Sequence, residues 1–403
     1  MSLMPTGRKN PGMVVAGIVL VVLFFSGKIV NLITDYFWFK EVNLLPVFLR
    51  ELYTKLGCGF AAGVFAFIVI SVNILIAARL SRRSEQFTGY LDPQTALILG
   101  KIPDLRMLLL GAAALVSFFI GSWAAGFWEV FLKASNAVPF AANDQLFGKN
   151  IGFYVFHLPF FRSIYFAAAA TLVLSFAGAA VYYLSRQNLI FDGRRVLVGR
   201  PARTQLLLLL GLLAGSLYFL FQFMIYQMVT SSGTLVSGAG FAQIKAAVPI
   251  LGALRYVSIV AAILIWITIF QRSLKLLGVA VALLLFGVAL GFVGSVSLHK
   301  FVVGPDELTK EAPYIRWSID NTRAAYGLDK IETKHFVPTG DMNAASLSAN
   351  QPTVNNIRLW DHAPLLTTYS QLQEIRTYYE FLDVDNDRYT INGTYRQVML
   401  SPR

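Results

Sequence analysis

Acidic residues are scarce in this 403-residue chain, and its longest apolar stretches contain none. Residues 1–300 hold 24 lysines and arginines but 9 aspartates and glutamates. Residues 301–403 hold 10 lysines and arginines and 13 aspartates and glutamates. The net charge of +12 therefore arises between apolar segments and not on one soluble face. This distribution argues against a nucleic-acid partner. It is typical of the loops that flank membrane spans.

Cysteine and histidine are also scarce. Cys58 is the single cysteine, which excludes an intrachain disulfide and a zinc site built on several thiolates. The four histidines show no ligand spacing, and the chain has no nucleophile elbow, phosphate-binding loop or zinc motif. We therefore expect no cofactor, and an enzymatic role is not favoured. His362 remains open to two interpretations, a catalytic group or an exposed cap before a helix, and the second is favoured.

What the sequence has in abundance is hydrophobic length. Hydrophobic residues make up 56% of the chain, and most of its apolar stretches reach the ~20 residues that a helix needs to cross a bilayer. We expect an all-α transmembrane bundle of seven helices over residues 1–300, followed by a small α+β segment over residues 301–403. The seven stretches, all without acidic residues or proline, are Met13–Val30, Leu56–Ala78, Met107–Trp128, Ser163–Leu184, Gln205–Met224, Tyr256–Phe270 and Leu276–Leu298.

The positive charges predict an orientation. Arg8 and Lys9 precede the first stretch, which has no cleavage site after it and is interpreted as an uncleaved anchor. If the N-terminus is cytoplasmic, the cytoplasmic segments of residues 1–300 hold 14 lysines and arginines, and the segments on the other side hold 10. For arginine alone, the two counts are 11 and 3. The bias favours this orientation. Residues 301–403 are then extracytoplasmic.

Pairs of glycines four residues apart occur in three of the stretches, where small residues let helices approach closely. They have two interpretations, packing within the bundle, which is favoured, or the interface of a homo-oligomer. Among polar side chains, Asn73 and Gln222 are expected to bond neighbouring helices, and Arg255 is expected near a span end. The glycine pairs are Gly59 and Gly63, Gly211 and Gly215, and Gly287 and Gly291.

Two segments have the pattern of a β-hairpin. Leu189–Phe191 and Val196–Val198 flank Asp192-Gly193, and a second pair of short strands flanks Asn392-Gly393, both strong turn signals. In the tail, a helix over Pro305–Gly327 with a break at Pro313 and a strand over Ile331–Val337 are also predicted.

Three aspartates at alternate positions form the best metal candidate of the tail. Asp383, Asp385 and Asp387 resemble the first ligands of a calcium loop. The sixth and twelfth positions are Arg388 and Thr394 rather than glycine and glutamate, so the segment is not an EF-hand. A looser Ca²⁺ site and a solvated acidic turn remain the two interpretations, and the second is favoured.

Several longer motifs resemble one family. The sequence Phe301–Leu308, the following Lys310-Glu311-Ala312-Pro313-Tyr314-Ile315, and the runs Asn321–Leu328, Asn356–Asp361 and Leu146–Tyr154 resemble the UPF0182 family of bacterial membrane proteins. The resemblance implies a seven-span bundle and a large extracytoplasmic domain, and it supplies no reaction. Members usually continue for several hundred residues where this chain stops at Arg403, so we expect a truncated domain. They also usually carry an aspartate and a histidine in the loop that is Gly238–Lys245 here.

These observations favour a bacterial inner-membrane protein whose bundle anchors an extracytoplasmic binding or assembly domain. Its expected partners are the lipid bilayer and other envelope proteins. A transporter or channel is the main alternative, disfavoured because the expected spans lack acidic residues and proline breaks. An envelope enzyme acting on lipid or cell-wall material is the third.

Overall fold

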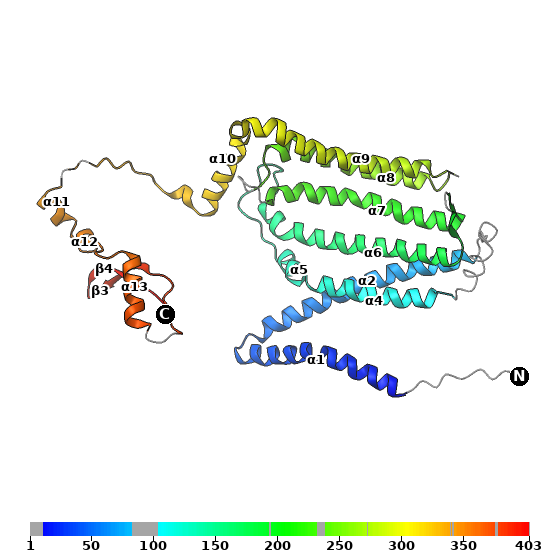
Figure 1. Cartoon of the computed structure of the whole chain (residues 1–403), viewed down its shortest axis with the longest axis horizontal. Helices are drawn as coiled ribbons and strands as arrows, with labels where there is room; N and C mark the ends of the chain where they lie inside the picture. The colour runs from blue at the N-terminus through cyan, green and yellow to red at the C-terminus, as the bar shows by residue number, and fades with distance from the viewer. Residues whose placement is uncertain are drawn as a thin grey trace. The chain divides into compact units, whose positions relative to one another are not determined.

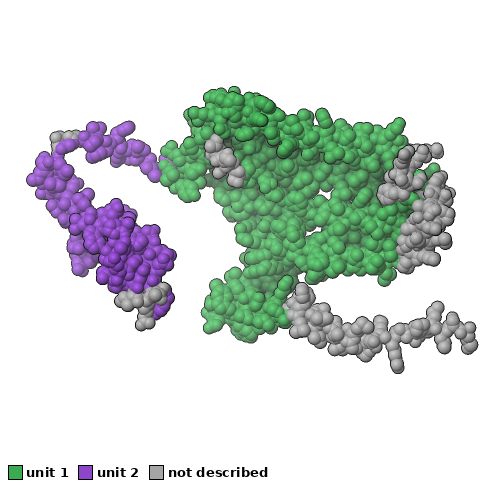
Figure 2. All heavy atoms as spheres, viewed as in Figure 1, with its two compact units in different colours: residues 1–328 green, residues 329–403 purple. Residues whose placement is uncertain are grey.

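The chain divides into two compact units, residues 1–328 and residues 329–403 (Figure 2). This is a computed structural model, and it describes residues 11–82, 104–192, 195–231, 238–271, 273–338, 340, 342–374 and 378–402. The first unit is helical apart from one short hairpin, and the second combines short helices with a two-stranded sheet.

Long helices lie side by side in the first unit (Figure 1). Helix α2 packs against both α4 and α6, and from there α6 contacts α7, α7 contacts α8, and α8 contacts α9. The long helices of the described residues are α1 (Pro11–Glu41), α2 (Leu45–Ser81), α4 (Arg106–Ala125), α6 (Leu158–Ser185), α7 (Arg200–Gln227), α8 (Val248–Ile267) and α9 (Lys275–Leu298).

The two ends of this bundle differ. At one, strands β1 (Leu189–Asp192) and β2 (Arg195–Val198) form the predicted antiparallel hairpin between α6 and α7. Its turn residue Gly193 lies outside the described residues. We call the end of the bundle that carries β1 and β2 the hairpin end. At the other lies the short helix α5 (Trp128–Ser135), and we call it the α5 end (Figure 1).

Among the described residues, six helices are long and apolar enough to cross a membrane, and they overlap six of the seven expected stretches. Seven spans are not confirmed. The first expected stretch, Met13–Val30, lies within α1, but the side chains of residues 11–25 are outside the described part of the structure. The six candidate spans are Leu45–Ser81, Arg106–Ala125, Phe153–Ser185, Arg200–Thr230, Gln243–Ile267 and Lys275–Ala325.

The sixth expected span was placed too late in the chain. The helix runs over Gln243–Ile267, beginning with a π-helical turn over Gln243–Ala247, and not over Tyr256–Phe270. Pro249 follows this π-helical turn as the second residue of α8, and the helical segment continues through it. Arg255 is therefore the middle residue of the helix, and its predicted position near a span end is wrong.

Buried polar side chains join the helices towards the hairpin end. The Tyr183 hydroxyl donates to Oε1 of Gln205 (2.8 Å), and Nε2 of Gln205 donates to the backbone oxygen (2.9 Å) and Oδ1 (3.2 Å) of Asn73. Ser81 donates to Oδ1 of Asn188 (2.8 Å). Asn73 thus bonds a neighbouring helix, as its position predicted, and each of these bonds satisfies a group that would be costly to bury alone.

The first glycine pair contacts a stripe of small residues on α4. A Cβ atom built on Gly59 would lie 3.0 Å from the backbone oxygen of Gly121, and one on Gly63 would lie 3.2 Å from that of Ser117. In the opposite direction, a Cβ on Gly121 would lie 2.6 Å from the backbone oxygen of Gly59. The two backbones are therefore in direct contact, which glycine alone allows.

The other predicted glycines also have neighbours within the chain. Gly211 accommodates the indole ring of Trp266, and Gly215 faces Ala262 across the contact between α7 and α8. On α9, Gly287 faces Leu254, and Gly291 faces Ile250 of α8. This geometry describes packing inside one bundle, and the homo-oligomer interface stays a prediction.

In the second unit, strands β3 (Asp385–Ile391) and β4 (Thr394–Leu400) form the predicted hairpin. Asn392 and Gly393 have φ values of 53° and 76°, the left-handed pair that a tight type I′ turn requires. The remaining elements are the helices α11 (Ala344–Ala349), α12 (Gln351–Val354) and α13 (His362–Gln373).

Two predictions for the tail were wrong. Ile331–Val337 forms no strand, because none of the described residues pairs with it. Helix α10 (Glu307–Ala325) continues through Pro313 without a break. A proline inside a helix removes one backbone hydrogen bond, and the turns on both sides of Pro313 keep theirs.

Candidate functional site

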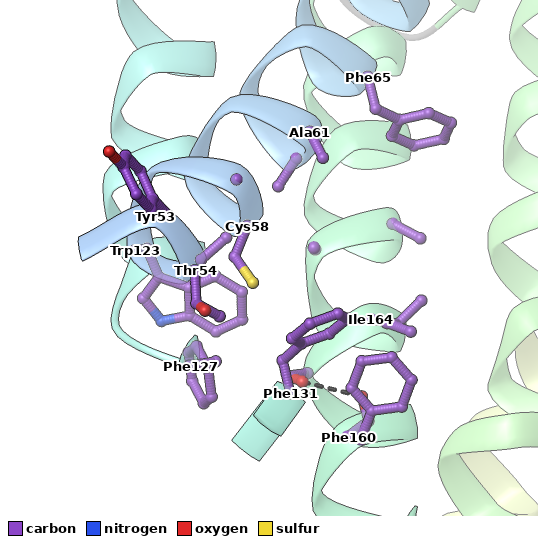
Figure 3. A pocket seen from close by; sticks show the side chains of 16 residues that line it. Tyr53, Thr54, Cys58, Ala61, Phe65, Trp123, Phe127, Phe131, Phe160 and Ile164 are labelled. Atoms are coloured by element: carbon purple, nitrogen blue, oxygen red, sulfur yellow. Dashed lines mark hydrogen bonds between the residues drawn. The ribbon is translucent and has the colours of Figure 1, made fainter. Parts of the chain in front are cut away.

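A cavity of about 730 Å³ lies between α2, α4, α5 and α6 near the α5 end (Figure 3). It is large enough for a small-molecule site, which typically occupies ~300–1,000 Å³. Its walls are aromatic on α4 and α5 and mostly small on α2 and α6. The lining residues named in Figure 3 are Tyr53, Thr54, Cys58, Ala61, Phe65, Trp123, Phe127, Phe131, Phe160 and Ile164.

The cavity offers almost no polar group to an occupant. None of its lining residues is charged. Two of its hydroxyls are already used, because Thr54 donates to the backbone oxygen of Arg50 (2.6 Å) and Ser163 donates to that of Phe160 (2.8 Å). The rings of Phe131 and Phe160 meet with centroids 6.0 Å apart, joining α5 to α6. Figure 3 shows the sulfur of Cys58 on the cavity side of α2.

Charged side chains lie outside the cavity on the same helices. Lys55 pairs with Glu51 one turn earlier on α2, and its ammonium lies 5.3 Å from the ring centre of Trp128 on α5. On α5, Lys133 pairs with Glu129 (2.7 Å). The cation over an aromatic ring helps to hold α5 against α2.

A second arrangement at the α5 end holds α10 against the start of α8. Glu311 is 8% exposed, and its two carboxylate oxygens accept the backbone N–H of Phe241 at 3.1 and 3.0 Å. The first N–H groups of a helix lack partners within the helix and carry partial positive charge, so they favour a carboxylate. Lys310 lies 5.8 Å above the Phe241 ring, and Tyr314 meets that ring edge-on at 6.3 Å. We call these contacts the Glu311 clamp.

The loop between α5 and α6 is fixed by one carboxylate. Asp144 accepts the Tyr154 hydroxyl (2.8 Å) and the backbone N–H groups of Phe147 (2.7 Å) and Lys149 (2.8 Å). The Lys149 ammonium lies 5.3 Å from the ring centre of Tyr226 at the end of α7. The motif Leu146–Tyr154 therefore folds one loop onto the bundle.

Arg255 is a charged side chain in the middle of the candidate span Gln243–Ile267. It donates to Oε1 of Gln222 on α7 and to the Tyr256 hydroxyl (3.3 Å), and its guanidinium lies 5.9 and 4.8 Å from the ring centres of Tyr218 and Tyr256. No carboxylate of the described residues forms an ion pair with it. Amide and ring contacts stabilise the cation in place of an acid.

At the hairpin end, Asp104 joins the beginning of α4 to the end of α6. The backbone N–H of Arg106 donates to it (3.0 Å) and lowers its pKa most, and Arg186 (3.1 Å) and the Tyr182 hydroxyl (3.2 Å) lower it further. The same contacts raise the pKa of Arg186, with the hydrogen bond to Tyr182 as the largest cause.

The three aspartates predicted as a metal candidate are exposed, and His362 is half-buried. Asp383 and Asp387 each accept the N–H of the following residue (2.7 Å in both cases), and Asp385 begins β3. The described residues contain no cluster of three metal-binding side chains, and the calcium site at these aspartates stays a prediction. His362 begins α13 with Asp361 as its cap, and its Nε2 lies 3.2 Å from Oδ1 of Asn386.

Comparison with known proteins identifies relatives along nearly the whole chain. A family profile described as "Uncharacterised protein family (UPF0182)" matches residues 12–403. A UPF0182 protein of Geobacter sulfurreducens is 36% identical over 400 residues, covering 98% of this chain and 45% of the relative. One of Geotalea uraniireducens is 34% identical over 401 residues, covering 98% and 44%. The chain thus spans less than half the length of these relatives.

No solved structure matches this chain. The motif that contains Glu311 and Tyr314 corresponds to the clamp, and the motif Leu146–Tyr154 corresponds to the loop held by Asp144. Together with the coverage of the family profile and the identity to several relatives, these motifs place the chain in the UPF0182 family.

Proposed function

We propose that this protein is a bacterial plasma-membrane protein whose helical bundle anchors an extracytoplasmic binding or assembly domain. Three features support the proposal: six helices of membrane-crossing length, the arginine bias towards the hairpin end, and the Glu311 clamp. The clamp is the observation that carries it. In this proposal the hairpin end is cytoplasmic and the α5 end is extracytoplasmic.

The clamp explains how a bundle acts as an anchor. Helix α10 forms the C-terminal part of the last candidate span, Lys275–Ala325, and leads from α9 to the second unit. Its buried carboxylate accepts the N–H of Phe241, just before the helical segment that leads through Gln243–Ala247 into α8. Breaking such a bond costs about 1–3 kcal/mol when it leaves a buried group unsatisfied. A fixed first helix gives the following domain a defined point of attachment.

Cysteine accessibility tests the orientation. Replacing Cys58 by alanine removes the single cysteine, and Ser401→Cys or Ser273→Cys then introduces one in the tail or at the hairpin end. In intact spheroplasts, a membrane-impermeant maleimide is expected to label the cysteine at 401 and not the one at 273. Permeabilised cells, in which both should react, are the control. Labelling at 273 alone would contradict the proposal.

Limited proteolysis of membranes tests the anchor itself. Glu311→Leu removes the acceptor oxygens and is expected to release α10 and speed cleavage between α9 and the tail, while the bundle stays protected. Glu307→Leu, which changes an exposed carboxylate in the same helix, should leave the cleavage rate at the wild-type value. Equal rates for the two variants would show that the clamp does not hold the helix.

Arg255 supports a second candidate function, a channel or transporter. An ionisable residue in the middle of a span commonly marks the path of an ion or polar substrate. A channel predicts conductance of the purified protein in planar bilayers and its loss in Arg255→Gln with unchanged thermal stability. An anchor predicts no conductance and a loss of stability in the same variant, because Gln222 loses its partner.

A further inference from the structure

We infer that the cavity between α2, α4, α5 and α6 binds one hydrocarbon chain of a membrane lipid. This inference rests on the membrane placement in the proposed function but not on the anchoring role, since it concerns what the bundle binds and not what it holds in place. The cavity is a product of how the helices pack, it lies at membrane depth, and its chemistry matches hydrocarbon.

The cavity exists because α2 is held by different neighbours along its length. Near the α5 end, Gly59 and Gly63 press one face of α2 against the backbone of α4. Nearer the hairpin end, Ile74 of α2 fits against Gly178 of α6, where a Cβ would lie 3.3 Å from its side chain. From Ile74 towards the α5 end α2 diverges from α6, and small residues on both helices leave space beside Cys58 and Ala61 (Figures 1 and 3).

The side chains that line the cavity favour an uncharged, apolar occupant. Small residues make up most of the α2 and α6 sides, and aromatic rings occur on every side of the cavity. A charged molecule would lose its hydration and find no charged partner among the lining residues, which is unfavourable in an apolar site. Water is also a poor occupant, because a buried water molecule needs two to four polar partners. A hydrocarbon chain needs none.

The bilayer is the source of such a chain. The lining residues of α2, α4 and α6 belong to candidate spans, so the cavity lies at the level of lipid tails. Phe131 and Phe160 close on each other beside α5, on the side of the cavity nearest the end of the bundle. A tail that enters between helices therefore keeps its headgroup at the membrane surface, near the charged pairs of α2 and α5.

Photo-crosslinking in vesicles tests the inference. The full chain is reconstituted in phosphatidylcholine that carries a diazirine in one acyl chain, and the modified peptides are identified by mass spectrometry. Adducts are expected to concentrate on the cavity side of α2 and α6. Ala168→Phe, which fills the cavity from α6, should reduce these adducts at least about tenfold, as expected for 1.4 kcal/mol of lost binding. Ala170→Phe, two residues further on and outside the lining, is the matched control.

Cys58 provides a second measurement without a new probe site. In lipid-depleted, detergent-solubilised protein, added phosphatidylcholine should slow alkylation of this thiol by N-ethylmaleimide. Ala61→Phe fills the cavity from α2, so it should abolish the lipid dependence even if Ala168→Phe does not fold. Adducts spread evenly over all lipid-facing helices, or a thiol reactivity that lipid does not change, would overturn the inference.

Discussion

Replacing Gly121 by alanine is expected to destabilise the bundle, because this position lies where α2 and α4 are in backbone contact. The added methyl group would lie 2.6 Å from the backbone oxygen of Gly59, whereas ordinary contacts of a Cβ begin at 3.4 Å. A backbone oxygen cannot turn away as a flexible side chain can. The two helices must therefore separate by a large part of an ångström.

The size of the effect follows from this separation. A gap of about 0.5–1 Å removes a quarter to a half of the dispersion attraction of each atom pair across the contact. Overpacking of close-packed interiors typically costs about 1–3 kcal/mol, and we expect Gly121→Ala to fall in this range. Gly111→Ala is the matched control, since it lies on the same helix with nothing within 4 Å of its Cβ. It should be neutral or stabilising by about 0.5–1 kcal/mol.

Unfolding of the purified variants in mixed micelles, titrated with sodium dodecyl sulfate, measures both changes. Gly59→Ala provides an intermediate point, because its Cβ would lie 3.0 Å from the nearest backbone oxygen. The expected order of stability is Gly111→Ala, then Gly59→Ala, then Gly121→Ala. If Gly121→Ala is as stable as Gly111→Ala, the close approach of α2 and α4 is wrong.

Three further outcomes are expected from the same assay. Gly211→Ala should destabilise by displacing the ring of Trp266, and Trp266→Phe in the same chain should recover part of the loss. Gln205→Leu should cost about 1–3 kcal/mol, because the buried Tyr183 hydroxyl loses its acceptor. Asp104 has a lowered pKa, so it stabilises the fold at neutral pH, and this contribution is lost as the pH falls through the lowered pKa. Asp104→Asn should therefore remove up to about 1 kcal/mol at pH 7 and flatten the acid limb of the pH–stability curve.

Much of the bundle could be predicted from the sequence, because crossing a bilayer imposes a length and a composition that a run such as Leu56–Ala78 displays directly. Both hairpins were predictable for a similar local reason. Asn392-Gly393 favours a left-handed turn whatever surrounds it. The sixth span was expected to begin at Tyr256, directly after Arg255, whereas the helix extends back to Gln243 and Arg255 lies in its middle.

The sites depend on contacts between distant segments, which local patterns do not reveal. Glu311 gave no signal as a helix cap, since Phe241 lies 70 residues away in the chain. The stripe of Ser117, Gly121 and Ala125 on α4 does have a signal, the same spacing of small residues as Gly59 and Gly63, and it was overlooked. No sequence signal predicted the cavity, because the cavity results from the angle at which α2 diverges from α6.

Three π-helical turns, Phe153–His157, Gln243–Ala247 and His299–Val303, lie where α6, α8 and α9 reach the α5 end. A π-turn holds one residue more than an α-turn does, so removing one residue converts it to ordinary helix. The part of the helix that lies in the bundle keeps its orientation about the helix axis, so the side chains that pack against neighbouring helices do not move. Each turn is thus a place where the chain can shorten by one residue without disturbing the interior. Length differences among relatives should collect there, and not at the hairpin end.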